Sequence, residues 1–146
     1  MEKSIDFWQI LVLLGTLQGL VLSVFLFTHK KGNARLNRLF GAVIFVATLE
    51  MGANVLYTSN YILDFPHIIG IDVPLTFCLP PLLYFYVRGL IARPFKKKYS
   101  YFLHLLPAVL TVLEFIPIYF STAAEKNLRY MTLLRDAELM EDLYLW

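Results

Sequence analysis

Two acidic residues lie inside long apolar stretches that contain no other acid: Glu50 and Glu114. Glu50 falls in the apolar run 39–58, and Glu114 falls in the apolar run 101–120. Each lies a little beyond the middle of its run, so two helices running in the same direction would place both carboxyls at a similar depth. A carboxyl group inside a membrane helix is costly and normally faces the interior of the bundle, which marks it as a candidate functional site.

Asn54 follows Glu50 by one helical turn and is the nearest candidate partner for its carboxyl group. Three interpretations of Glu50, Asn54 and Glu114 stay open. They line a ligand or ion pocket open to the outside, they form a proton-sensitive switch, or two neutral acids hydrogen-bond helices together. No histidine is expected at this depth, so the sequence does not predict a metal site.

Small and polar residues line one face of the first apolar run. Gly15 and Gly19 form a GxxxG pattern that Ser23 extends, and Gln18 lies between them near the middle of the run. Small residues at this spacing let a second backbone approach closely, and a glutamine can hydrogen-bond across the contact. The pattern predicts either a homodimer seam or packing within one bundle.

Proline residues interrupt the later apolar runs at Pro80, Pro81 and Pro107. A proline inside a helix removes a backbone hydrogen bond, and such sites are candidate hinges. Prolines are also frequent in ordinary membrane helices.

The sequence contains none of the common catalytic motifs, and Cys78 is its single cysteine. No catalytic residue, metal ligand set or cofactor is predicted, so the chain is not expected to be an enzyme.

The elements that must position these residues are four apolar runs, at about 7–28, 39–58, 73–91 and 101–120. Each is near the roughly 20 residues that a membrane-spanning helix needs. The composition agrees, because 58% of the 146 residues are hydrophobic and only 16% are charged. The predicted fold is an all-α integral membrane protein whose first domain, 1–120, has four transmembrane helices.

The basic residues predict the orientation of these helices. They gather in the first and third loops, whereas the second loop, 59–72, has no lysine or arginine; the loop cations are Lys30, Lys31, Arg35, Arg38, Arg88, Arg93, Lys96, Lys97 and Lys98. Basic loops remain in the cytoplasm. Both termini are therefore expected outside, and the predicted location is the inner membrane of a bacterium.

The tail, 121–146, carries five acids and cannot span a membrane. An amphipathic helix outside the membrane is predicted there, docked on the bundle or lying at the interface, and an ordinary loop helix is the alternative. Its apolar face would hold Tyr130, Leu133, Ala137, Met140 and Tyr144. The chain ends in Leu-Tyr-Leu-Trp, which suggests a piece of a longer protein.

Four short motifs occur in a specific order. Leu14-Gly15-Thr16-Leu17-Gln18-Gly19 opens the first run, and Asn33 and Asn37 precede Leu39-Phe40; Pro81-Leu82-Leu83-Tyr84-Phe85-Tyr86-Val87 closes the third, and His104-Leu105-Leu106-Pro107 opens the fourth. Together they resemble the membrane-embedded N-terminal region of AraC-type helix-turn-helix regulators from Bacteroidetes-like bacteria. The resemblance extends to about Phe120. It departs from the family where Pro80 replaces the glycine that often precedes Pro-Leu-Leu-Tyr.

This resemblance implies a one-component membrane sensor. Such proteins continue into further spans and a cytoplasmic DNA-binding domain, neither of which lies in these 146 residues. Any DNA binding would belong to that missing part, and this chain would receive a small ligand or an envelope signal. A homodimer would suit regulators that bind paired half-sites.

Two other functions compete with the sensor. A fragment of a multi-span transporter or carrier would also use bent helices and intramembrane acids. A small structural membrane protein that ends at Trp146 is the third interpretation, and it predicts a tail docked on the bundle.

Overall fold

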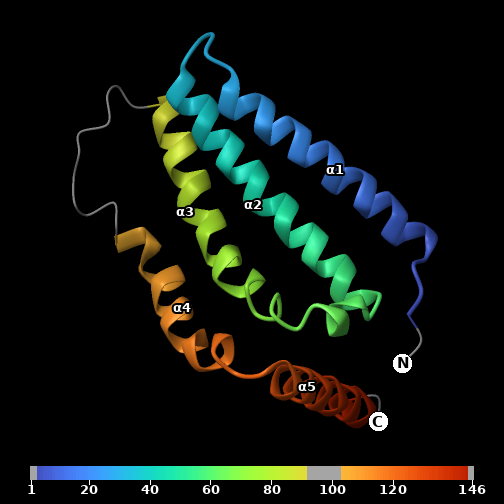
Figure 1. Cartoon of the computed structure of the whole chain (residues 1–146). Helices are drawn as coiled ribbons and strands as arrows, with labels where there is room; N and C mark the ends of the chain where they lie inside the picture. The colour runs from blue at the N-terminus through green and yellow to red at the C-terminus, as the bar shows by residue number, and fades with distance from the viewer. Residues whose placement is uncertain (1–2, 92–102, 145–146) are drawn as a thin grey trace.

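The computed structural model describes residues 3–91 and 103–144, and every regular element in these ranges is helical. In chain order these are α1 (Phe7–Thr28), α2 (Ala34–Thr58), the short 3-10 helix η1 (Tyr61–Asp64), α3 (Asp72–Ile91), α4 (Leu106–Tyr119) and α5 (Ala123–Tyr144) (Figure 1). The predicted all-α class is therefore confirmed for the described residues.

The first three predicted spans agree closely with α1, α2 and α3. The bounds of α1 match the predicted run 7–28, whereas α2 begins five residues before the predicted 39. This earlier start arises because the Asn33 side chain caps the helix, accepting a hydrogen bond from the Leu36 backbone N–H at 3.3 Å. These three helices are long and apolar enough to cross a membrane.

The fourth predicted span, 101–120, is longer than the helix that forms. The α-helix α4 has 14 residues, and at 1.5 Å per residue it measures about 21 Å, short of a hydrocarbon core of about 30 Å. The predicted start at 101 lies outside the described residues. A fourth crossing is available only if 103–119 and 123–137, which meet at a bend of 116°, count as one broken span.

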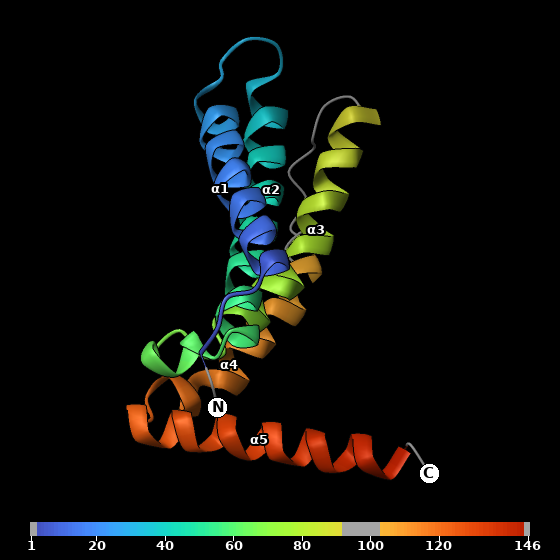
Figure 2. The ribbon, with the colours of Figure 1, turned by 90° about the vertical axis from the view of Figure 1, so that its right-hand side faces the viewer.

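The long helices form an open layered arrangement. Contacts join α1 to α2, α2 to α3, and α3 to α4, so neighbours in sequence are also neighbours in space. Figure 1 shows α1, α2 and α3 side by side, with α4 continuing along the lower part of α3. The view in Figure 2 shows α5 crossing below the ends of the other helices instead of running along them.

Few of the described side chains are buried. Large apolar side chains are exposed along the sides of the helices, among them Leu14, Leu17, Val24, Leu90, Leu110 and Leu113. Val46, Val55, Ile62 and Ala108 are the buried apolar residues in the described ranges. A water-soluble monomer rarely exposes such a large contiguous apolar surface, and this one is suited to contact with lipid or other helices.

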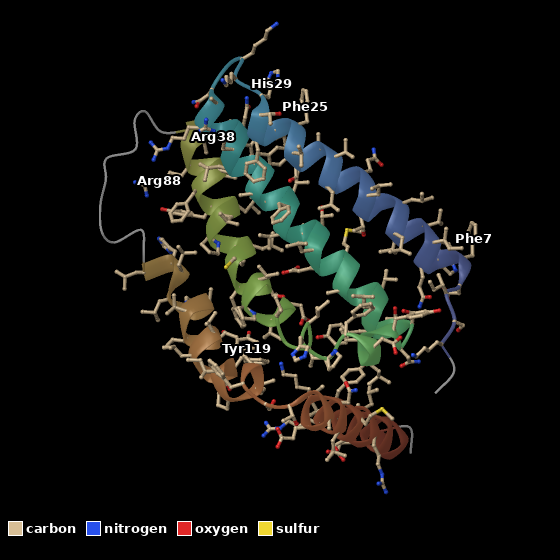
Figure 3. The ribbon with its side chains drawn as sticks, viewed as in Figure 1. Phe7, Phe25, His29, Arg38, Arg88 and Tyr119 are labelled. Atoms are coloured by element: carbon tan, nitrogen blue, oxygen red, sulfur yellow. The ribbon has the colours of Figure 1, made fainter. Side chains whose placement is uncertain are left out.

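The two ends of the helices differ in charge. Figure 3 shows Arg38 and Arg88 at one end of α2 and α3, while Tyr119 lies at the opposite end, where α4 meets α5. At the tyrosine end, the Lys3 ammonium pairs with the Asp64 carboxylate at 2.6 Å. The described part of the chain thus separates a basic end from an end that carries acids and tyrosines.

Candidate functional site

Glu50 is half-buried on α2, whereas Glu114 is exposed on α4. One oxygen of the Glu50 carboxyl group is buried without a hydrogen-bond partner in the described part of the protein. The Cys78 thiol of α3 is near enough to interact electrostatically with this carboxyl group. A buried polar atom without a partner is costly and calls for an explanation, such as an unseen water, ion or ligand group.

The other two members of the predicted constellation do not join Glu50. Asn54 lies one turn away but its side chain is exposed, and the Glu114 side chain is exposed on α4. The helices α2 and α4 are not among the closely contacting pairs, because α3 lies between them in the contact order. The structure thus leaves Asn54 and Glu114 on exposed surfaces, apart from the half-buried Glu50.

The small residues of α1 divide between two faces. Gly19 lies directly against the Thr48 side chain of α2, so a Cβ at this position would clash with Thr48. Ser23 is fully buried, and its carbonyl oxygen lies 3.3 Å from where a Cβ on Gly41 would be. Gly15 has open space around it and Gln18 is exposed. Gly19 and Ser23 therefore pack α1 on α2 within one chain, and Gly15 and Gln18 remain available for another partner.

The predicted hinge residues occupy regular helix. The helix α3 is continuous from Asp72 to Ile91 through Pro80 and Pro81. Pro107 lies in the first turn of α4, where its missing N–H has no intrahelical acceptor in any case. The expectation that Pro107 interrupts the fourth helix is therefore wrong, because the helix begins there.

Tyr57 is the centre of a hydrogen-bond network at the tyrosine end. Its hydroxyl donates to a carboxylate oxygen of Asp72 at 2.9 Å and accepts from the Gly70 backbone N–H at 3.1 Å. The Tyr119 hydroxyl donates to the Gly70 carbonyl at 3.0 Å. These bonds join the end of α2, the loop before α3 and the end of α4. Asp72, the first residue of α3, accepts the hydrogen bond from the Tyr57 hydroxyl.

Gly70 is required at the middle of this network. Its φ of +82° favours glycine, and a Cβ there would lie 2.9 Å from a ring carbon of Phe115. Both the backbone conformation and the close approach of α4 therefore exclude a side chain.

The helix α5 docks beside this network through Asn127 and Tyr130, of which only Tyr130 belongs to the predicted apolar face. The Asn127 amide donates to the Leu63 carbonyl at 3.2 Å, and the Tyr130 hydroxyl donates to the Tyr57 carbonyl at 3.4 Å. Leu133 is 67% exposed and Ala137 is also exposed; the predicted Met140 and Tyr144 side chains lie outside the described part. The face of α5 that docks is determined by hydrogen bonds to the loop and to the end of α2. Apolar periodicity in the sequence does not reveal such bonds.

A capping box begins α5. The Thr122 backbone N–H donates to Glu125 at 2.9 Å, and the Glu125 backbone N–H donates to the Thr122 hydroxyl at 3.3 Å. The bond from the Thr122 backbone, with a further one from its side chain, lowers the pKa of the Glu125 carboxyl. The capping box fixes the start of α5 directly after the sharp bend that separates it from α4.

A groove of about 760 Å³ lies between α3, α4 and the start of α5. Its walls are mainly apolar and include Pro74, Leu75, Ala108 and Val112, and the Cys78 thiol also lines it. Polar groups from His67, Tyr119 and Lys126 gather at its α5 end. Its volume falls within the range of about 300–1,000 Å³ that is usual for ligand pockets.

Lys126 is the charged residue at the end of this groove. Its side chain is only 2% exposed, and its ammonium group donates to the Tyr119 carbonyl at 3.2 Å. Within residues 3–91 and 103–137, whose side chains are described, no carboxylate lies within ion-pair distance of it. Lys126 thus closes the carbonyl end of α4 and places a buried positive charge beside the groove.

At the basic end, aromatic residues from three of the quoted motifs make ring contacts. The His104 ring lies 4.8 Å from the Tyr84 ring and 5.9 Å from the Phe85 ring, centroid to centroid. Phe40 stacks on Tyr86 at 4.7 Å, which joins α2 to α3. The aromatic residues of these motifs therefore hold α2 against α3, and α3 against the start of α4, at this end of the protein.

Sequence analysis missed Tyr57, Tyr119 and Lys126 as parts of a site. The Thr122-x-x-Glu125 pattern was a usable signal, because a capping box predicts that α5 starts there and brings Lys126 back toward the end of α4.

No protein-family model matches the chain, and no curated protein or solved structure is significantly similar to it.

Proposed function

We propose that this chain is the membrane-embedded input domain of a one-component transcriptional regulator. The observation that carries the proposal is the buried Glu50 oxygen that lacks a partner in the described structure. A carboxyl group at this depth can take up a proton or a ligand hydrogen bond, and either event changes the contact between α2 and α3. The motif resemblance supports the regulatory class.

The proposed orientation places the basic end in the cytoplasm. Arg38 and Arg88 lie together at that end, in keeping with the preference of lysine and arginine for cytoplasmic loops. The tyrosine network and α5 would then lie at the periplasmic face of a bacterial inner membrane, with both termini outside. We propose that the bent pair 103–119 and 123–137 completes the fourth crossing, with its bend near the outer interface, because α4 alone is shorter than the hydrocarbon core.

Polar residues on the lateral surface support further helical partners. Gln18 on α1, Asn54 on α2 and Glu114 on α4 are all exposed on helices that are otherwise apolar. A polar or charged group facing hydrocarbon is costly, so these faces are suited to contacts with other helices. We propose a homodimer through Gly15 and Gln18 of α1, and further spans of a longer protein beside Asn54 and Glu114. Contact with DNA would belong to that longer protein.

A transporter fragment is the second candidate, and the sharp bend between α4 and α5 is the observation that favours it. Transporters use such broken helices around substrate sites. The continuity of α3 through its two prolines gives this candidate no support from the third helix.

The proposal is tested by changing Glu50 to glutamine in the native gene and measuring the transcript profile of the cell across envelope stresses and pH. Glutamine keeps the shape but cannot ionise, so the transcripts that respond to the signal are expected to become insensitive to it. Membrane levels of the variant should equal those of the wild type.

Glu114→Gln is the matched control, because its side chain is exposed and away from Glu50. It is expected to leave the response intact if Glu50 acts without it. An unchanged transcript profile in Glu50→Gln, with normal membrane insertion, would contradict a regulatory role for this acid.

A further inference from the structure

We propose that the groove between α3, α4 and α5 binds a long-chain fatty acid, with its carboxylate at Lys126 and its alkyl chain between α3 and α4. Binding itself does not depend on the proposed function, whereas the identification of this fatty acid as the signal rests on it.

The first argument concerns charge. A lysine ammonium carries three N–H donors, and the described structure shows one of them bonded, to the neutral Tyr119 carbonyl. A cation that is removed from water without an anionic partner carries a large desolvation cost. Lys126 is nearly completely buried and lines the groove. A ligand anion entering the groove would supply the missing counter-charge.

The second argument concerns the apolar walls. Pro74, Leu75 and Cys78 of α3 face Ala108 and Val112 of α4 across the groove. Four turns of α4, from Leu105 to Tyr119, run beside it, which corresponds to about 21 Å of helix. An alkyl chain laid along these turns would fill the space between the two helices and make van der Waals contacts with both apolar walls. The groove thus combines one anion-binding end with an apolar channel, which is the pattern of a single-chain amphiphile.

The number of charges selects a monoanion. Lys126 is the buried cation of the described groove, and the other polar groups at its end are the His67 ring and the Tyr119 hydroxyl. The Tyr119 hydroxyl is already used by the Gly70 carbonyl. One ammonium with two remaining donors suits a carboxylate with two oxygens. A phospholipid of the bilayer, which has two chains and a larger head, is the alternative that the test must separate.

Cys78 supplies a direct readout, because it lines the groove and is the single cysteine of the chain. The 146-residue protein is placed in nanodiscs of zwitterionic lipid, and alkylation of Cys78 by N-ethylmaleimide is followed by mass spectrometry. Palmitate is expected to slow alkylation at least tenfold at saturation. Hexadecanol, which has the chain without the charge, and acetate, which has the charge without the chain, are expected to have little effect.

Two variants, with one control, separate the contribution of the Lys126 charge from that of the groove's width. Lys126→Met removes the charge and is expected to weaken palmitate protection at least tenfold, the order expected for loss of a charge-assisted hydrogen bond. Arg129→Met, on an exposed position of the same helix, is the matched control and should protect as the wild type does. Val109→Phe narrows the groove from an exposed position of α4, so it should reduce protection while leaving Lys126 in place.

Several results would overturn the proposal. Equal protection by palmitate and hexadecanol, or full protection in Lys126→Met, would exclude recognition of the carboxylate. Protection by nanodiscs containing phosphatidylglycerol but not by palmitate would assign the groove to a bilayer lipid. No protection under any condition in a protein with wild-type helicity would show that the groove holds no amphiphile. If palmitate protects while Glu50→Gln leaves transcription unchanged, the binding site stands and the proposed regulatory function fails.

Discussion

The contact between α1 and α2 and the contact between α3 and α4 are built in opposite ways. The first is closed by small residues: Gly19 lies on Thr48, Gly41 lies near Ser23, and Gly52 lies near Thr16. The second is held at its two ends, by His104 against Tyr84 at one and by Tyr119 bonded to Gly70 at the other. Between those ends it leaves a groove.

This difference separates a part of the bundle that cannot adapt from one that can. In a lipid environment helix association depends on close packing and polar contacts, because hydrocarbon gives no hydrophobic drive between helices. The α1–α2 contact has such packing along its length and should behave as a rigid support. The α3–α4 contact leaves room for a ligand, so its geometry should respond to what fills it.

The largest expected effect comes from filling the small-residue contact. Gly19→Leu would push a side chain into Thr48, and this overpacking is expected to cost about 3 kcal/mol of unfolding free energy. Gly15→Leu, four residues earlier in open space, should cost very little in a monomer. Unfolding of both variants in mild detergent by a denaturing-detergent titration compares them, and equal losses would contradict the assignment of Gly19 to the α1–α2 contact.

A smaller loss is expected at the glycine that joins the loop to α4. Gly70→Ala combines a strained positive φ with a clash against Phe115, at an expected cost of about 2 kcal/mol. Gly32→Ala shares the positive φ, +74°, but has no neighbour within 4 Å, so it should cost only about 1 kcal/mol. The same unfolding titration gives both values. If Gly32→Ala lowered the free energy of unfolding more than Gly70→Ala did, the close approach of Phe115 to Gly70 would not contribute to stability.

Removing one hydroxyl of the tyrosine network should have a still smaller effect. Tyr119→Phe loses the bond to the Gly70 carbonyl and is expected to cost about 1 kcal/mol. Tyr130→Phe loses a longer bond, 3.4 Å to the Tyr57 carbonyl, and should cost less. Hydrogen exchange of the 59–71 loop provides the measurement, with faster exchange expected in Tyr119→Phe. Unchanged exchange in both variants would remove the network as the device that holds this end.

The smallest effect is expected in the groove itself. Val109→Phe adds volume where space exists, so its effect on unfolding free energy should stay within about 0.5 kcal/mol. Val46→Phe makes the same change at a buried position of α2 and is expected to cost about 2 kcal/mol by overpacking. Thermal unfolding in detergent compares the pair. Similar destabilisation by both would show that the α3–α4 contact is as closed as the rest.

Much of this architecture follows from the sequence because long apolar runs report helices directly. The bounds of α1 and the course of α2 and α3 were predictable from run length alone, and the Asn33 cap explains the longer α2. The short α4 was not, since 103–120 is apolar apart from His104, Thr111 and Glu114, and its composition does not show where the chain turns. The capping box at Thr122 was the local signal for that turn.

The site was less predictable, because it depends on which face of each helix meets a neighbour. Glu50 could be singled out from its cost in an apolar run, and the structure buries one of its oxygens. Glu114 has the same sequence signal but lies on an exposed face of α4. Lys126 gave no signal of this kind, since a lysine in a charged tail is usually solvated, and its burial depends on the bend that returns α5 to the end of α4.

The orientation of the bundle is the central claim, because it assigns the tyrosine network and the α5 end of the groove to the outside and the basic end to the cytoplasm. Single cysteines placed at Asn33 and Phe65 in a Cys78→Ser background can be tested with a membrane-impermeant maleimide in intact cells. The Phe65→Cys protein is expected to react, and the Asn33→Cys protein is expected to react only after the membrane is permeabilised. The reverse pattern would place the basic end outside and contradict the account.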